Sequence, residues 1–166
     1  MKRFPPREAI LDQLAYVLDE IEALKPLIRR VPAIVLESRP MSDTYAINEI
    51  FAWMGLADKY LWLPRMQAVV KGEVITGLEE EVKARLQEEG WRIRPIGAIL
   101  EMQAAHRRAL LDYLRSLTPE EWEREVAGPA EEKVSVQELA YLLTQEDVRY
   151  LRAVGERLHE SHVSLR

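Results

Sequence analysis

The fold class is decided by residues 7–30, which read REAILDQLAYVLDEIEALKPLIRR. Apolar side chains recur in this stretch at every third or fourth residue, the spacing that lines them up along one face of an α-helix. They are Ile10, Leu14, Val17, Ile21, Leu24 and Ile28. The stretch therefore predicts a long amphipathic helix near 7–30. Pro26 should kink it or end it early, because proline lacks the backbone N–H that a helix interior needs.

Three further stretches have the same periodicity and predict helices near 45–70, 95–117 and 135–159. Pro64 should bend or split the second of them. The link over residues 71–94 is long and holds only a short predicted helix over 78–89. Four amphipathic helices of this length favour an all-α four-helix bundle, with a long connection between the second and third helices. We expect the bundle to form a single domain over residues 1–166.

The composition narrows the possible functions. The chain has 166 residues and no cysteine, which excludes a disulfide scaffold, a thiol nucleophile and a cysteine-based metal site. Its net charge of -5 argues against a nucleic-acid partner. No apolar run reaches the roughly 18 residues of a membrane span, and no secretory segment opens the chain, so we expect a cytoplasmic protein. Abundant arginine with a single asparagine fits either a heat-adapted source or a GC-rich genome.

Seven polar or aromatic side chains fall on or beside the inner faces of the predicted helices. They are Glu49 and Trp53 on the second helix, Gln103 and His106 on the third, and Glu146, Asp147 and Tyr150 on the fourth. Such groups need hydrogen-bond partners once buried. They can form a structural network, line a ligand or catalytic pocket, or bind a metal, and the residues alone leave these interpretations open. For Glu146 the expected partner is an arginine, His106 or a tyrosine hydroxyl, with His106 as the first candidate.

Three stretches resemble the signatures of one protein family. Residues 45–54 (YAINEIFAWM) resemble the second helix of DinB-like proteins, and residues 116–122 (SLTPEEW) resemble the exit from their third helix. Residues 135–151 (SVQELAYLLTQEDVRYL) resemble their fourth helix. Together with the number and spacing of the predicted helices, the resemblance covers nearly the whole chain. The chain is thereby identified as a member of the DinB/YfiT-like four-helix bundle family.

The resemblance also implies a metal site, with three histidine ligands. In the family one histidine lies on the second helix and two lie four residues apart on the fourth, and characterised relatives are metal-dependent hydrolases or thiol transferases. The matching positions here are Trp53, Glu146 and Tyr150. Tryptophan cannot bind a metal and neutral tyrosine binds one poorly, so we expect no metal and no other cofactor at this site.

Three functions follow from this comparison of motifs. The first is a metal-free protein that binds a small molecule or a partner through the seven residues. The second is an enzyme, with metal ligands moved to Glu146, His106 and Asp147, or with the Glu146 carboxylate as an acid or base. The third is a purely structural dimer. We also expect a homodimer, since the apolar stretch 60–64 (YLWLP) exceeds what one core face requires.

Overall fold

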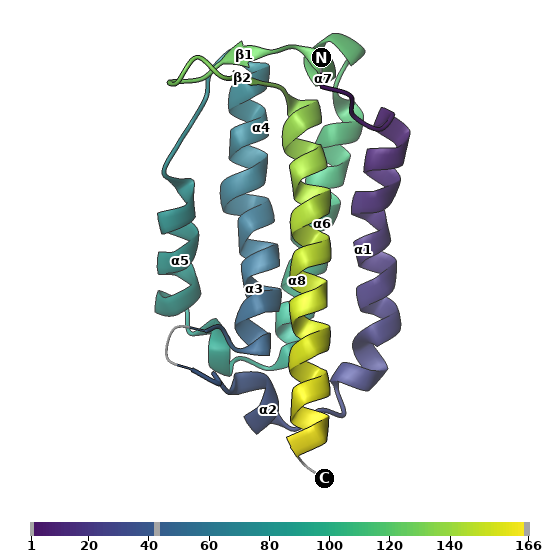
Figure 1. The fold of residues 1–166 in the computed structure, drawn as a ribbon, viewed down its shortest axis with the longest axis vertical. Coiled ribbons are helices and arrows are strands. Elements are labelled where there is room, and N and C mark those ends of the chain that lie inside the picture. Colours follow the sequence, from purple (N-terminus) through teal and green to yellow (C-terminus); the bar gives the residue numbers. More distant parts are fainter. Residues whose placement is uncertain (1, 42–43, 165–166) are drawn as a thin grey trace.

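The computed structural model describes residues 2–41 and 44–164, with side chains as far as Ser161. It shows the predicted all-α four-helix bundle (Figure 1). The bundle helices are α1 (Arg7–Ile28), α3 (Ile47–Ala57) continued by α4 (Leu63–Val70), α6 (Ile96–Ser116) and α8 (Val136–Ser164). Shorter helical elements connect them: α2 (Ala33–Glu37), α5 (Leu78–Glu88), the 3₁₀ turn η2 (Trp91–Ile93) and α7 (Pro119–Glu123). Before α8, β1 (Val126–Ala127) pairs antiparallel with β2 (Lys133–Val134).

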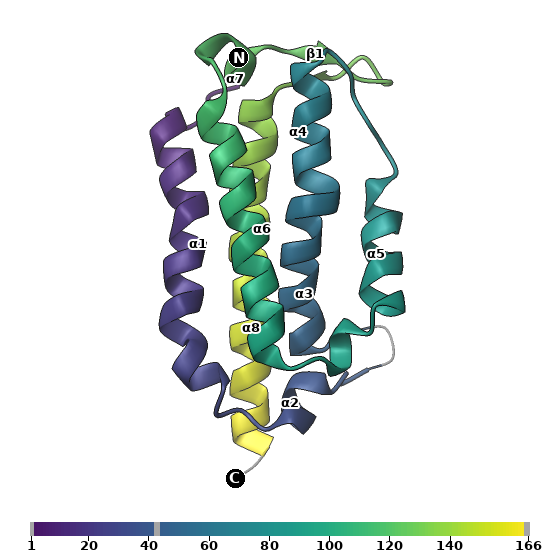
Figure 2. The same cartoon turned by 180° about the vertical axis from the view of Figure 1, so that it is seen from behind.

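The long connection between the second and third bundle helices determines the topology. Figures 1 and 2 show α1 and α8 running in one direction along the bundle, and α3–α4 and α6 running in the other. Two consecutive helices can be parallel only if the chain returns between them, and α5 makes that return along the outside. In cross-section α3 packs against α6 and α8, and α1 packs against the same two helices.

The two prolines within predicted helices have different effects. Pro26 lies inside α1, and this helix ends two residues later at Ile28, close to the expected early end. Pro64 follows a wider π-helical turn, η1 (Asp58–Trp62), in which the Leu63 N–H bonds to the Asp58 carbonyl five residues back. The second bundle helix is therefore neither broken nor regular, because α3, η1 and α4 continue one another through this turn.

The stretch 60–64 is not the exposed apolar patch that the sequence suggested. Leu61 is 4% exposed and Trp62 is 8% exposed, and both belong to the hydrophobic core of the monomer. Tyr60 and Leu63 pack against the same core. The predicted exposed patch at 60–64 is therefore wrong as a dimer interface, because η1 turns these side chains into the core of the monomer. Homodimerisation itself stays a prediction.

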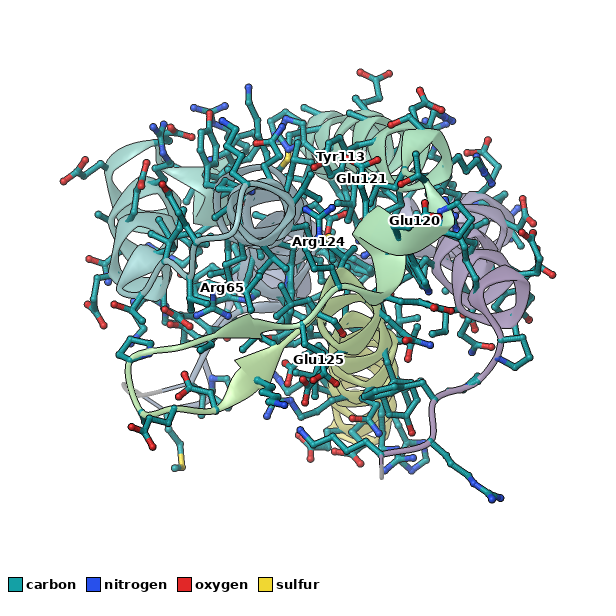
Figure 3. All side chains as sticks on the ribbon, turned by 90° about the horizontal axis from the view of Figure 1, so that it is seen from above. Arg65, Tyr113, Glu120, Glu121, Arg124 and Glu125 are labelled. Atoms are coloured by element: carbon teal, nitrogen blue, oxygen red, sulfur yellow. The ribbon has the colours of Figure 1, made fainter. Side chains whose placement is uncertain are left out.

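The end of the bundle at α4 and α7 is covered by charged residues that do not gather into one site. Arg124 follows α7 and donates a hydrogen bond to the Val70 carbonyl at the end of α4 (3.2 Å). Seen from above, Arg65, Glu120 and Glu125 lie apart from one another around this end (Figure 3).

Within the described part of the chain, no helix is both long and apolar enough to cross a membrane.

Candidate functional site

A buried arginine connects all four bundle helices. Arg107 of α6 is 1% exposed. Its guanidinium donates two hydrogen bonds to Asp58 of η1 (2.7 and 3.2 Å), two to Asp147 of α8 (2.8 and 2.9 Å) and one to the Leu14 carbonyl of α1 (3.1 Å). These bonds use all the N–H groups of the side chain. Arg107, Asp58 and Asp147, here called the Arg107 cluster, therefore hold the helices together at mid-height through fully matched polar groups.

The charges in the Arg107 cluster do not balance, since two carboxylates share one guanidinium. Burial raises the pKa of Asp147 to about 6; the negative charge of Asp58 adds to this rise, and Arg107 opposes it. Burial also raises the pKa of Asp58, again against the effect of Arg107. The two carboxylates are coupled, so the proton taken up below neutral pH belongs to the pair.

Two of the predicted site residues, Gln103 and His106, contact α3 where it crosses α6. The Nδ1 atom of His106 lies 2.8 Å from the Gly55 carbonyl oxygen, which only accepts, so Nδ1 carries the proton. Burial lowers the pKa of His106, and the imidazole is therefore neutral at pH 7. The Nε2 atom of Gln103 lies 3.5 Å from Met54 Sδ, while its buried Oε1 has no partner among the described residues.

Two more predicted residues, Glu146 and Tyr150, surround an arginine on the outer side of α8. Arg149 Nη2 donates to Glu146 Oε2 at 2.5 Å and reaches the Tyr150 hydroxyl at 3.5 Å. Burial raises the pKa of Tyr150, so its phenol stays protonated. His106, the first candidate for the partner of Glu146, is wrong, because its imidazole binds a carbonyl of α3. The carboxylate pairs instead with an arginine, the other charged partner expected, one turn along its own helix.

The remaining predicted residues, Glu49 and Trp53, lie one turn apart on α3. Trp53 is half-buried and stacks on Tyr45, with ring centroids 6.4 Å apart. Glu49 is 1% exposed and accepts hydrogen bonds from Arg39 and from the Ala46 backbone N–H. Burial pushes the pKa of Glu49 upward, but these bonds outweigh it and hold the pKa below its usual value. Each of the predicted residues thus has partners of its own.

The family resemblance implies a metal centre at Trp53, Glu146 and Tyr150, and these residues do not fit one. An indole has no lone pair for a metal, and a protonated phenol is a weak ligand. Glu146 offers a carboxylate, but Arg149 already binds it. A single carboxylate is fewer than the three protein ligands of most catalytic zinc sites.

The relocated ligand set of Glu146, His106 and Asp147 does not fit a metal either. Both oxygens of Asp147 accept hydrogen bonds from Arg107, which brings a positive charge to the place a cation would need. Nδ1 of His106 is bonded to Gly55. Among the described residues, no group of three or more His, Cys, Asp or Glu side chains lies close enough together to hold a metal ion.

Sequence reasoning missed Asp58 and Arg107, although a signal for the arginine was present. Arg107 lies four residues after Gln103 and three before Leu110, so it occupies the same helical face as these two buried residues. A charged residue in the middle of an apolar face needs a buried counter-charge. Asp58 had a weaker signal, because the π turn that begins at this residue shifts the helical register.

Comparison with known proteins gives one family and one fold. The family model described as the DinB superfamily matches residues 22–153. The chain is similar to the solved structure of YfiT from Bacillus subtilis, described as a probable metal-dependent hydrolase with an unusual four-helix bundle topology. The TM-score is 0.69, with 12% sequence identity over 96% of this chain and 93% of that one. No curated protein matches the chain in sequence.

Proposed function

Because this chain belongs to the DinB superfamily, we propose that it is a member that binds a small molecule without using the family's metal centre. The single observation that carries the proposal is the donor set at the positions that match the family's metal ligands: of Trp53, Glu146 and Tyr150, only Glu146 offers a good ligand. Its carboxylate already accepts a hydrogen bond from Arg149. One carboxylate is fewer than the three protein ligands of most catalytic zinc sites.

In this proposal the ligand contacts Trp53, Tyr150 and the Glu146–Arg149 pair. Trp53 and Tyr150 are both half-buried, so each keeps part of an aromatic ring accessible. Tyr150 adds a protonated hydroxyl, and the Glu146–Arg149 pair adds charged groups beside it. Binding sites commonly combine aromatic walls with a few polar groups that fix the orientation of the ligand. The chemistry expected of the ligand is a flat or aliphatic body with a hydrogen-bonding group.

The runner-up from the sequence, an enzyme with relocated metal ligands, lacks a supporting observation. It needs the Asp147 carboxylate, which is 4% exposed and bonded through both oxygens to Arg107. Releasing this carboxylate would break a buried ion pair that joins α6 and α8. Binding of a ligand at Trp53 and Tyr150 requires no such rearrangement.

A thermal-shift screen of small molecules tests the proposed function. We expect compounds that raise the unfolding temperature of the wild-type protein without added metal and in the presence of a chelator. Their effect should be lost in Trp53→Ala and reduced in Tyr150→Phe. Tyr141→Phe, which removes a hydroxyl elsewhere on α8, serves as the matched control and should retain the shift. Stabilising compounds that ignore Trp53→Ala, or that act only with a divalent cation, would contradict the proposal.

A further inference from the structure

A polar hollow of about 280 Å³ lies where the start of α3 meets the end of α5 and η2. Its lining includes two arginines, Arg39 and Arg92, together with Glu49 and the amide of Gln87. The residues that line it belong to elements that meet at the end of the bundle where α2 is labelled in Figure 1.

Arg39 is oriented at this hollow by a buried carboxylate. Its Nε and Nη2 atoms donate to the two oxygens of Glu49 at 2.7 and 2.5 Å. Glu49 is itself fixed, because it is buried and also accepts from the Ala46 N–H at 2.9 Å. The third guanidinium nitrogen of Arg39, Nη1, has no hydrogen-bond partner among the residues that the structure describes. Its N–H groups are available to a ligand in the hollow.

Arg92 is held at the same hollow through its backbone. The buried side chain of Asn48 donates to the carbonyl groups of Arg92 and Arg94 at 2.9 and 3.3 Å, which fastens η2 and the residue after it to α3. The Arg92 guanidinium makes one bond, from Nη1 to the Glu37 carbonyl at 3.1 Å. Its guanidinium and the Glu49 carboxylate both line the hollow, and its positive charge helps to hold the pKa of Glu49 low.

The charges of Arg39, Arg92 and Glu49 sum to one positive charge. Arginine is suited to oxyanions, since its planar N–H groups match the oxygens of carboxylates and phosphates. We propose that this hollow binds a small oxyanion, a carboxylate or phosphate group, between Arg39 and Arg92. The hollow shares Glu49 with the predicted site residues, but its two arginines lie outside that set, and the inference does not depend on the proposed function.

Calorimetric titration with inorganic phosphate, and separately with succinate, tests this site at constant ionic strength set by sodium chloride. Arg92→Ala should weaken binding about tenfold, the effect of losing a charged hydrogen bond. Arg94→Ala is the matched control. Arg94 lies nearby and stacks on Trp91 (4.0 Å), but it does not line the hollow, so binding should stay within about twofold.

Glu49→Gln gives a change of opposite sign. It removes the negative charge, frees Arg39 and raises the local charge by one unit, so phosphate should bind at least about threefold more tightly. Binding of both probes supports a general oxyanion site, and binding of phosphate alone supports a phosphate group. Absence of saturable binding in the wild type, or equal losses in Arg92→Ala and Arg94→Ala, would overturn the inference. The two arginine variants decide the question even if Glu49→Gln does not fold.

Discussion

The Arg107 cluster and the Glu146–Arg149 pair both include residues of α8, and they differ in how many of their polar groups have hydrogen-bond partners on other helices. Arg107 and Asp147 are almost fully buried, and every N–H of the guanidinium has an oxygen partner on another helix. Arg149 is exposed, and its partners Glu146 and Tyr150 lie on its own helix. The Arg107 cluster therefore connects different helices, whereas the Glu146–Arg149 pair lies within one helix.

The difference separates the residues expected to set stability from those of the proposed ligand site. Removing one partner from a buried ion pair costs about 3–5 kcal/mol, whereas an exposed pair contributes about 0–1 kcal/mol. The Arg107 cluster should therefore determine stability and have no direct access to a ligand. The Glu146–Arg149 pair can be rearranged at small cost, as a binding surface requires.

The largest expected effect is that of Arg107→Met. This change leaves two carboxylates buried without a counter-charge and should lower the free energy of unfolding by about 3–5 kcal/mol at pH 7. Urea unfolding measures it, with Arg108→Met as the control, because the neighbouring Arg108 is exposed. A loss below about 1 kcal/mol, the range of exposed pairs, would mean that the cluster does not hold the helices together.

The second prediction concerns the pH dependence of the same cluster. The pKa of Asp147 is about 6 in the folded protein, against an ordinary value of 3.8 for an aspartate in the unfolded chain. Between these two pH values the folded protein therefore holds a proton that the unfolded chain has released. The free energy of unfolding should therefore fall as the pH rises from 4 to 7, relative to Asp147→Asn, by roughly 2–3 kcal/mol. Exposed Asp112→Asn is the control. If the free energy of unfolding of the wild type relative to Asp147→Asn stays constant or rises with pH, Arg107 lowers the pKa of Asp147 more than burial raises it.

A smaller effect is expected beside the cluster, at the crossing of α3 and α6. A Cβ atom on Gly55 would lie 2.5 Å from Met102 Sδ and 2.9 Å from Gln103 Cα. Gly55→Ala should therefore cost about 1–3 kcal/mol by overpacking. Gly155→Ala on α8, where a Cβ meets no atom within 4 Å, should instead stabilise the helix by up to about 1 kcal/mol. Thermal unfolding of the two variants should shift in opposite directions, and equal shifts would refute the close crossing.

The smallest effect on stability is expected at Glu146. Glu146→Gln removes the charge of an exposed pair and should change the free energy of unfolding by less than about 1 kcal/mol. Chemical denaturation measures this value, and Arg149→Gln should give a similar one. A loss as large as that of Arg107→Met would place Glu146 among the structural residues and remove it from the proposed ligand surface.

Helical periodicity predicted the bundle well, because the apolar faces of α1, α3, α6 and α8 are what the helices bury against one another. The turn at η1 escaped prediction, since no residue pattern distinguishes a π turn from an α-helical one in this stretch. The hydrogen-bond partner of a buried polar side chain was harder to predict than its burial. Asp147 was expected to face inward and does so, but which of the available cations it meets depends on how helices distant in sequence pack together.

We propose that the three positions matching the family's metal ligands, Trp53, Glu146 and Tyr150, no longer bind a metal in this chain. Nickel bound per chain is to be measured in tag-free wild-type protein and in the triple variant Trp53→His, Glu146→His, Tyr150→His. We expect no stoichiometric nickel in the wild type and about one equivalent in the variant, whose three imidazoles would complete a site. About one equivalent in the wild type that Glu146→Ala removes, or none in a folded triple variant, would contradict this proposal.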